Sequence, residues 1–214
     1  MREKTTLQGN KLKERLKIIN WFGIGAGILM LALPFLGAWW QAEVGTGAME
    51  LAFSPFYYHV SFLEQTLTSP LVGYFILAAK LMIIIGGALM ITGSMATDRW
   101  WGKKLMRFGA MKVFWFLIIL IALLLLGAFF VNNFLPGILS GMVEGGGGVT
   151  TQFQVPYIAG STTSTIQASG ATISAPISTS LTSAFWIAVI TAGLGIAARI
   201  YHGRLVKKLG VEVD

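Results

Sequence analysis

Four stretches of the chain are apolar over about the 20 residues that an α-helix needs to cross the hydrocarbon of a bilayer. They cover residues 18–36, 71–95, 110–131 and 183–201. The pattern predicts an all-α membrane protein built as a four-transmembrane-helix bundle. The first stretch is longer than the apolar region of a usual signal peptide, and no clear A-x-A site follows it, so we expect an uncleaved signal anchor.

Basic side chains are confined to one side of these predicted spans. Of the 16 Lys and Arg residues, all but Lys80 fall in three segments of the chain, at the N-terminus, around residues 99–112 and from residue 199 onward. The positive-inside rule therefore places both termini in the cytoplasm of a multi-pass protein of the cell membrane. The predicted segments outside the spans are a basic tail (1–17), external loop 1 (37–70), a basic cytoplasmic loop (96–109), external loop 2 (132–182) and a C-terminal tail (202–214).

External loop 1 is expected to contain a short interfacial helix. Ser54 and Pro55 are typical of an N-cap and a first helical position. Apolar side chains then recur at helical spacing, at Phe56, Val60, Leu63 and Leu67. The helix is expected to stop before Pro70.

External loop 2 changes composition at a run of four glycines, residues 145–148, which predicts a flexible joint. Apolar and polar residues alternate from Val149 to Tyr157, and residues 163–168 and 171–175 flank a Ser-Gly turn candidate. This pattern predicts a small β meander. The segment is also rich in Ser and Thr, so a disordered or O-glycosylated stalk is the alternative.

Small residues predict where the helices pack, because close approach of backbones drives helix association in a bilayer. The expected contact residues are Gly23, Gly27, Gly86, Gly87, Ala188 and Ala192. The third span is almost uniformly bulky and is expected to be peripheral or to face a partner. The GxxxG pair at Gly23 and Gly27 leaves a homo-oligomer open.

Aromatic and basic side chains mark the expected lipid interfaces. Tryptophan is enriched where helices meet the headgroups, and clustered Lys and Arg attract anionic lipids. The predicted interface residues are Trp39, Trp40, Trp100, Trp101, Lys103, Lys104 and Arg107. A specific anionic-lipid site at the second Trp pair is the alternative to simple anchoring.

Lys80 lies near the middle of the second span, where a charge is costly and usually faces a bundle interior or a wet cavity. No Asp or Glu lies in any span, and the nearest acidic residue along the chain is Glu64. Three interpretations stay open. Lys80 snorkels or binds carbonyls, it contacts a partner subunit or a lipid headgroup, or it serves a substrate, proton or quinone site.

The composition excludes several kinds of chemistry. The chain has no cysteine, so it forms no disulfide and holds no Cys-ligated metal. It carries none of the common nucleotide-binding, zinc-protease or serine-hydrolase motifs. The formal charge of +7 does not indicate nucleic acid, because the basic residues lie beside apolar runs. We expect no catalytic residue, no metal and no cofactor; His59 and the loop glutamates lack a zinc-ligand pattern.

The order of tail, spans and loops resembles the topology of claudins and tetraspanins. The cysteine-containing motifs of those families are absent, so no residue role is transferred. The sequence favours a non-catalytic accessory or structural subunit that binds other membrane or cell-surface proteins through its external loops. The alternative is a subunit of a quinone-linked membrane redox enzyme, or a small transporter, that uses Lys80.

Overall fold

A computed structural model describes residues 19–142, 150–152, 154–168 and 171–209. The chain divides into two compact units. Unit 1 takes its residues from Met1–Phe35, Lys80–Trp115 and Ile187–Asp214, and unit 2 from Leu36–Ala79 and Phe116–Trp186. The Gly145 to Gly148 joint and most of the basic tails lie outside the described residues.

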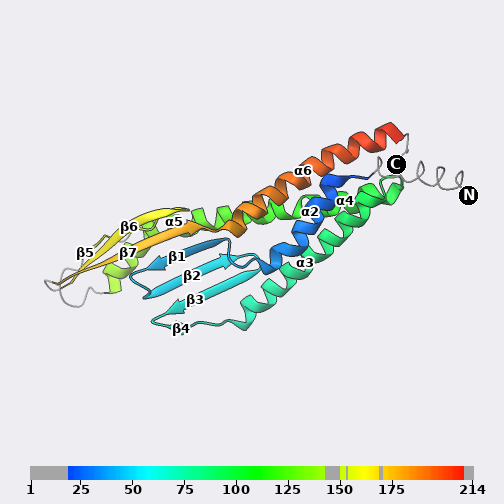
Figure 1. The fold of residues 1–214 in the computed structure, drawn as a ribbon. Helices are drawn as coiled ribbons and strands as arrows, with labels where there is room; N and C mark the ends of the chain where they lie inside the picture. The colour runs from blue at the N-terminus through cyan, green and yellow to red at the C-terminus, as the bar shows by residue number, and fades with distance from the viewer. Residues whose placement is uncertain (1–18, 143–149, 153, 169–170, 210–214) are drawn as a thin grey trace, which may run out of the picture. The chain divides into compact units, whose positions relative to one another are not determined.

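Five α-helices are described, and Figure 1 labels each of them. They are α2 (Trp21–Ala32, followed by the 3-10 helix η1, Leu33–Phe35), α3 (Pro70–Met95), α4 (Trp100–Ala110), α5 (Lys112–Met142) and α6 (Ser183–Leu209). Three stretches are long and apolar enough to cross a membrane, namely Pro70–Met95, Trp100–Ile138 and Ser183–Lys207. These helices confirm the expectation of a membrane protein.

The predicted bundle of four transmembrane helices is not confirmed, because α2 is short. Its 12 α-helical residues and the 3 residues of η1 reach about 24 Å at the usual rises of 1.5 and 2.0 Å per residue. That length is less than the roughly 30 Å of bilayer hydrocarbon. Among the described residues, the predicted first span therefore forms only a shorter apolar helix.

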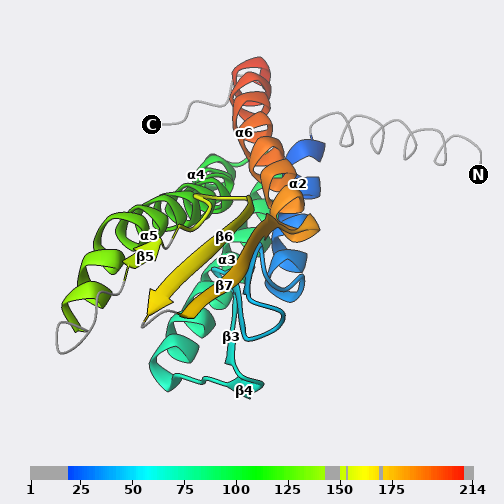
Figure 2. The ribbon, with the colours of Figure 1, turned by 90° about the vertical axis from the view of Figure 1, so that its left-hand side faces the viewer.

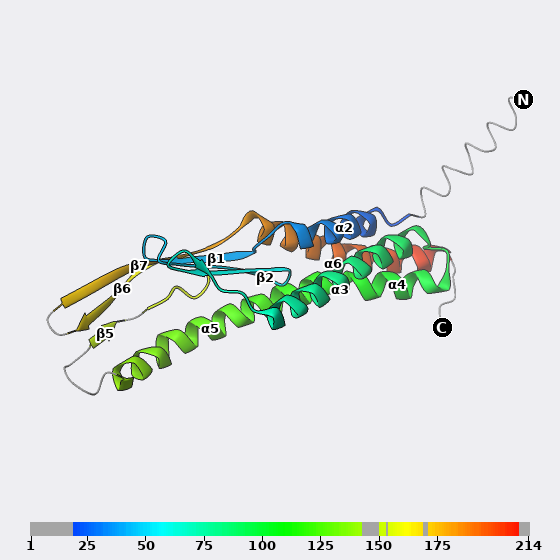
Figure 3. The same ribbon diagram turned by 90° about the horizontal axis from the view of Figure 1, so that it is seen from below.

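Helices α2, α3, α4 and α6 run together in unit 1 (Figure 3). They approach one another closely at glycines. A β-carbon built on Gly27 of α2 would lie 3.0 Å from the carbonyl oxygen of Gly87 of α3. One built on Gly195 of α6 would lie 2.6 Å from the carbonyl oxygen of Ala110 of α4. These backbones are nearly in contact, which only residues without bulky side chains permit.

Asn20 joins three helices of unit 1 and is fully buried. Its side-chain oxygen accepts a hydrogen bond from the Gly23 backbone N–H (3.2 Å) and so caps α2. Its Nδ2 donates to the carbonyl oxygen of Ala198 in α6 (2.7 Å). Its backbone N–H donates to the carbonyl oxygen of Ser94 in α3 (3.1 Å). The side chain and backbone of this one residue thus fix the start of α2 against both neighbours.

Unit 2 contains a seven-stranded antiparallel sheet, so the prediction of an all-α protein is wrong. The strand order is β4-β3-β2-β1-β7-β6-β5. The strands are β1 (Trp40–Val44), β2 (Met49–Ser54), β3 (Tyr57–Phe62), β4 (Gln65–Thr66), β5 (Thr150–Gln152), β6 (Gly160–Ala168) and β7 (Ala171–Leu181). Strands form in both segments that the sequence assigns to external loops.

The two groups of strands meet at the centre of the sheet, where β1 pairs with β7 from Trp40↔Leu181 to Val44↔Ile177. Strands β5, β6 and β7 pair in sequence order, and the long β6 and β7 lie side by side (Figure 2). The predicted β meander is therefore present, but it forms one half of a larger sheet. The turn at residues 169 and 170 lies outside the described residues.

The interfacial helix predicted in external loop 1 is wrong, because two β-hairpins take its place. Pro55 and Phe56 form the turn between β2 and β3, and Ser54 pairs with Tyr57 across it. The Oγ of Ser54 accepts a hydrogen bond from the Phe56 N–H (3.2 Å). Leu63 and Glu64 link β3 to β4 with φ of 47° and 67°. Both residues thus adopt the left-handed conformation that a type I′ hairpin turn requires.

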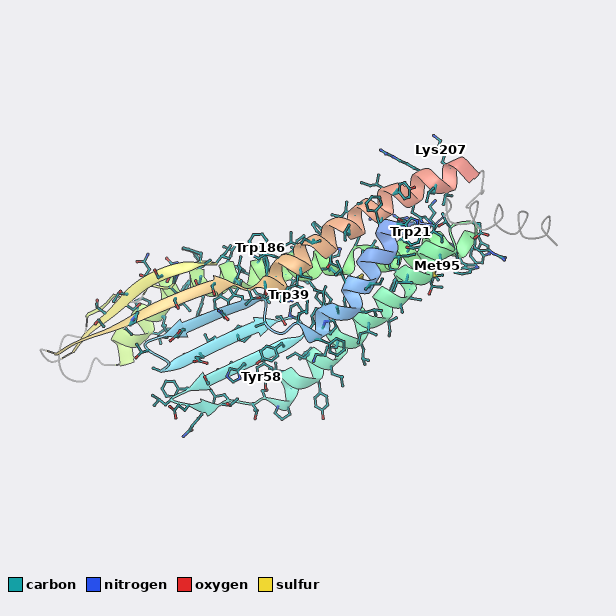
Figure 4. All side chains as sticks on the ribbon, in the orientation of Figure 1. Trp21, Trp39, Tyr58, Met95, Trp186 and Lys207 are labelled. Carbon is teal, nitrogen blue, oxygen red and sulfur yellow. The ribbon has the colours of Figure 1, made fainter. Side chains whose placement is uncertain are left out.

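The hydroxyl of Tyr58 ties the β3 strand to the start of α3 (Figure 4). It accepts a hydrogen bond from the backbone N–H of Ser69 (2.6 Å) and donates one to the Ser69 carbonyl oxygen (3.3 Å). Residues 57–62 are rich in aromatic and β-branched side chains, which favour strands. This contact fixes the outer strands of unit 2 beside the helix that follows them.

Candidate functional site

Lys80 lies in α3, is partly buried, and has neither a hydrogen bond nor an ion pair with any described residue. Its predicted partner Glu64 is exposed in the turn between β3 and β4. The two residues belong to different units, so their pairing stays a prediction. A substrate, proton or quinone site at Lys80 also stays a prediction.

We expect Lys80→Met to leave the melting temperature unchanged or to raise it. The substitution removes a costly charge from an apolar helix and breaks no hydrogen bond or ion pair with a described residue. Lys104→Met in α4 is the matched control, because it removes a cation–π contact with Trp100 at 5.0 Å. Thermal unfolding in detergent compares the two variants. A clear loss of stability for Lys80→Met alone would reveal a partner for this ammonium group.

Helix α4 occupies the segment predicted to be a short cytoplasmic loop, and it has two different faces. Gly102, Met106, Gly109 and Ala110 are buried within unit 1. The opposite face is exposed and mixes aromatic with basic side chains, namely Trp100, Lys104, Arg107 and Phe108. Trp101 and Lys103 are half-buried. Such an amphipathic basic helix suits a membrane surface, so lipid contact by these residues stays a prediction.

The structure places the other predicted interface pair inside unit 2. Trp39 is fully buried and meets the Phe56 ring edge-on at 5.6 Å (Figure 4). Trp40 is 7% exposed, stacks on Phe53 at 6.0 Å, and donates a hydrogen bond from Nε1 to the Ile158 carbonyl oxygen (2.7 Å). Both rings contact protein, which differs from the headgroup contact that an aromatic belt requires.

The six small residues predicted to pack helices are all buried in unit 1. Gly23 faces the Ser94 side chain, and Gly86 lies 3.2 Å from the methyl group of Met30, measured from a built β-carbon. Ala188 and Ala192 lie on one side of α6 and are 0% and 4% exposed. These six residues therefore pack helices against one another within a single chain.

One face of the sheet in unit 2 is polar and contains a depression of about 250 Å³. Its side chains come from four adjacent strands and include Gln41, Glu43, Glu50, His59, Ser178 and Ser180. Glu43 of β1 lies directly opposite Glu50 of β2. Glu43 accepts a hydrogen bond from the Gly47 N–H (3.1 Å), and neither carboxylate has an ion pair with a described residue.

Metal binding gains no support from this depression. No group of three His, Cys, Asp or Glu side chains within the described part of the chain could hold a metal ion.

The opposite face of the sheet is apolar and borders a cavity of about 900 Å³. Trp40, Ala42 and Val44 point there from β1, because they alternate with the polar Gln41 and Glu43. The remaining walls come from β2, β7, residues 155–157, the start of α3 and one side of α5. All of the lining residues belong to unit 2, and none of them is charged.

Trp40 of the cavity was predicted from the sequence only as a lipid-interface residue, and His59 and the glutamates of the depression were considered only as metal ligands. Neither site was predicted as such. The signal that locates them is the strict alternation of apolar and polar residues at 40–44 and 49–51, which assigns the two faces once these segments are taken as strands.

Comparison of the chain with models of protein families, with curated proteins and with solved structures finds no match. The two faces of the sheet in unit 2 are therefore the basis for a functional interpretation.

Proposed function

We propose that the protein is a non-catalytic accessory or structural subunit of a membrane assembly, and that the polar face of its sheet binds another protein. In the orientation that the positive-inside rule favours, the strands of this sheet belong to the two segments on the external side, 37–70 and 132–182, and both termini lie in the cytoplasm. The observation that carries the proposal is the pair Glu43 and Glu50, which lie opposite each other and have no ion pair with a described residue.

Like charges directly opposite each other on neighbouring strands are destabilising. Unit 2 contains no Lys or Arg, so no ammonium or guanidinium group of its own sheet or loops faces this pair. A lysine or arginine of a partner protein would supply the missing charge. The depression between Gln41 and His59 offers such a side chain additional hydrogen-bond partners.

Zero-length carboxyl-to-amine crosslinking in native membranes tests this proposal. We expect a crosslink from Glu43 or Glu50 to a lysine of one defined partner, and its loss in the Glu43→Gln/Glu50→Gln double variant. Glu64→Gln is the matched control, because Glu64 lies in an exposed turn outside the depression. Equal crosslinking by the double variant, or links from Glu64 alone, would contradict binding at this face.

The same pair gives a prediction for the protein without its partner. We expect Glu50→Gln to raise the free energy of unfolding by about 0.2–1 kcal/mol, because the substitution removes a cross-strand repulsion. Chemical unfolding of the purified protein measures this change, and Glu64→Gln should have no comparable effect. A destabilised Glu50→Gln protein would indicate that the carboxylate already has a favourable partner within the chain.

A further inference from the structure

We propose that the apolar cavity of unit 2 binds the hydrocarbon chain of a membrane lipid. This site lies on the face of the sheet opposite to Glu43 and Glu50. It is therefore independent of the proposed binding of a partner protein.

The lining of the cavity selects an apolar ligand. Only three of its side chains carry a nitrogen or oxygen atom, those of Trp40, Ser54 and Tyr157. Trp40 already donates to the Ile158 carbonyl oxygen, and Ser54 already accepts from the Phe56 N–H. Tyr157 is 48% exposed, so it is placed to meet the polar end of an amphiphile at the edge of the cavity.

The size of the cavity calls for an occupant. The cavity of unit 2 has a volume of about 900 Å³ and is partly open to its surroundings, so a ligand can enter it. It falls within the range of about 300–1,000 Å³ that is usual for ligand pockets.

A protein segment fits this space less well than a hydrocarbon chain. An extended peptide would bring backbone amides to walls that offer almost no hydrogen-bond partners. A helix with a diameter of about 10 Å would place only some seven residues in about 900 Å³. An acyl or isoprenoid chain needs neither hydrogen bonds nor that width.

The helices that line the cavity connect it to bilayer hydrocarbon. Three of the lining residues, Phe75, Ile76 and Ala79, belong to α3. A larger number belong to α5, between Phe116 and Leu135. Both helices belong to stretches long and apolar enough to cross a membrane. A lipid chain can follow their apolar surfaces into the cavity without crossing water.

Directed hydrogen bonds hold one edge of the cavity in place. The side chain of Asn132 in α5 donates from Nδ2 to the Val155 carbonyl oxygen (2.9 Å) and accepts from the Val155 N–H (2.7 Å). The amide thus pairs with the backbone as a neighbouring strand would. Residues 155–157 are thereby fixed against α5, so this wall is formed before any ligand binds.

Gly127 of α5 provides a direct test, because it lines the cavity and a β-carbon built there meets no atom within 4 Å. Gly127→Leu should fill part of the cavity without a clash. Gly193→Leu in α6 is the matched control, since Gly193 also has open space around it and does not line the cavity. Ala42→Leu, on the sheet wall, fills the same space from the other side.

The probe is a C16 fatty acid that carries a diazirine on its chain, added to the purified protein in detergent and mapped by peptide mass spectrometry. We expect labelling of cavity residues in the wild type and in Gly193→Leu, and at least a tenfold loss in Gly127→Leu and Ala42→Leu. Labelling of exposed α6 side chains should stay the same in all four proteins, which reports on intact folding.

Three results would overturn the proposal. They are labelling confined to exposed helix surfaces, undiminished cavity labelling in both filling variants, and a co-purified peptide crosslinked within the cavity. Partner crosslinking at Glu43 and Glu50 should persist in Gly127→Leu, so failure of the lipid site is distinguishable from failure of the proposed function.

Discussion

Gly93→Ala is expected to destabilise the protein by about 3 kcal/mol, near the upper end of the usual cost of overpacking. A β-carbon at this position of α3 would lie 2.6 Å from the carbonyl oxygen of Gly102 and 2.7 Å from the backbone nitrogen of Met106. Both atoms belong to the backbone of α4, so no change of rotamer relieves the clash. The two helices must separate, and the buried side chain of Met106 then loses contacts.

Thermal unfolding in detergent measures the effect of Gly93→Ala. A loss of about 3 kcal/mol corresponds to a fall of roughly 6–12 °C for a chain of this size. Gly73→Ala in the same helix is the control, because a β-carbon there meets no atom within 4 Å. Alanine favours helix over glycine by up to about 1 kcal/mol, so this control should be neutral or stabilising. Equal melting temperatures for the two variants would contradict the close contact between α3 and α4.

Phe56→Ala is expected to cost about 3–5 kcal/mol, the usual loss when a large buried aromatic side chain is removed. The ring is 1% exposed and lies edge-on to both Trp39 (5.6 Å) and Phe116 (5.4 Å). The Phe56 ring thus joins the turn between β2 and β3 to Phe116 of α5. Without it, the ring of Trp39 loses a neighbour and a cavity remains.

Chemical unfolding together with near-ultraviolet circular dichroism checks this second result. Tyr57→Ala is the matched control, since the adjacent ring is 40% exposed and should cost far less. The pair also tests the conformation of the segment. In a hairpin, Phe56 and Tyr57 have opposite environments, and a similar small effect of both substitutions would contradict the turn at Pro55 and Phe56.

The sequence was sufficient to locate the long helices. Residues 71–95, 110–131 and 183–201 coincide largely with α3, α5 and α6, because about 20 apolar residues in a row have few alternatives to a membrane helix. Helix α4 was missed because its charges suggested a loop. Its buried Gly102, Met106 and Gly109 nevertheless recur at helical spacing, and that amphipathic pattern was available in the sequence.

The sequence of the segment after Ser54 is compatible with both a helix and a strand. Phe56, Val60, Leu63 and Leu67 fit a helix, while residues 57–62 also have the aromatic and β-branched composition of a strand. Pairing with β2, and of β1 with β7 beyond it, favours the strand in the structure. A partner strand that lies more than a hundred residues away gives no local signal, so the joining of the two groups of strands into one sheet could not be predicted.

The pairing of β1 with β7 also means that the sheet cannot be completed until late in synthesis. Strand β7 begins at Ala171, whereas β1 ends at Val44, and synthesis at about 5–20 residues per second separates them by roughly 6–25 s. During that interval β1 can pair with β2, but its other edge, which later pairs with β7, has no partner. Unpaired strand edges are prone to wrong pairing. Helices α3, α4 and α5 are all synthesised between these two strands. Biogenesis therefore depends on protecting a half-finished sheet until the last helix of the chain is about to emerge.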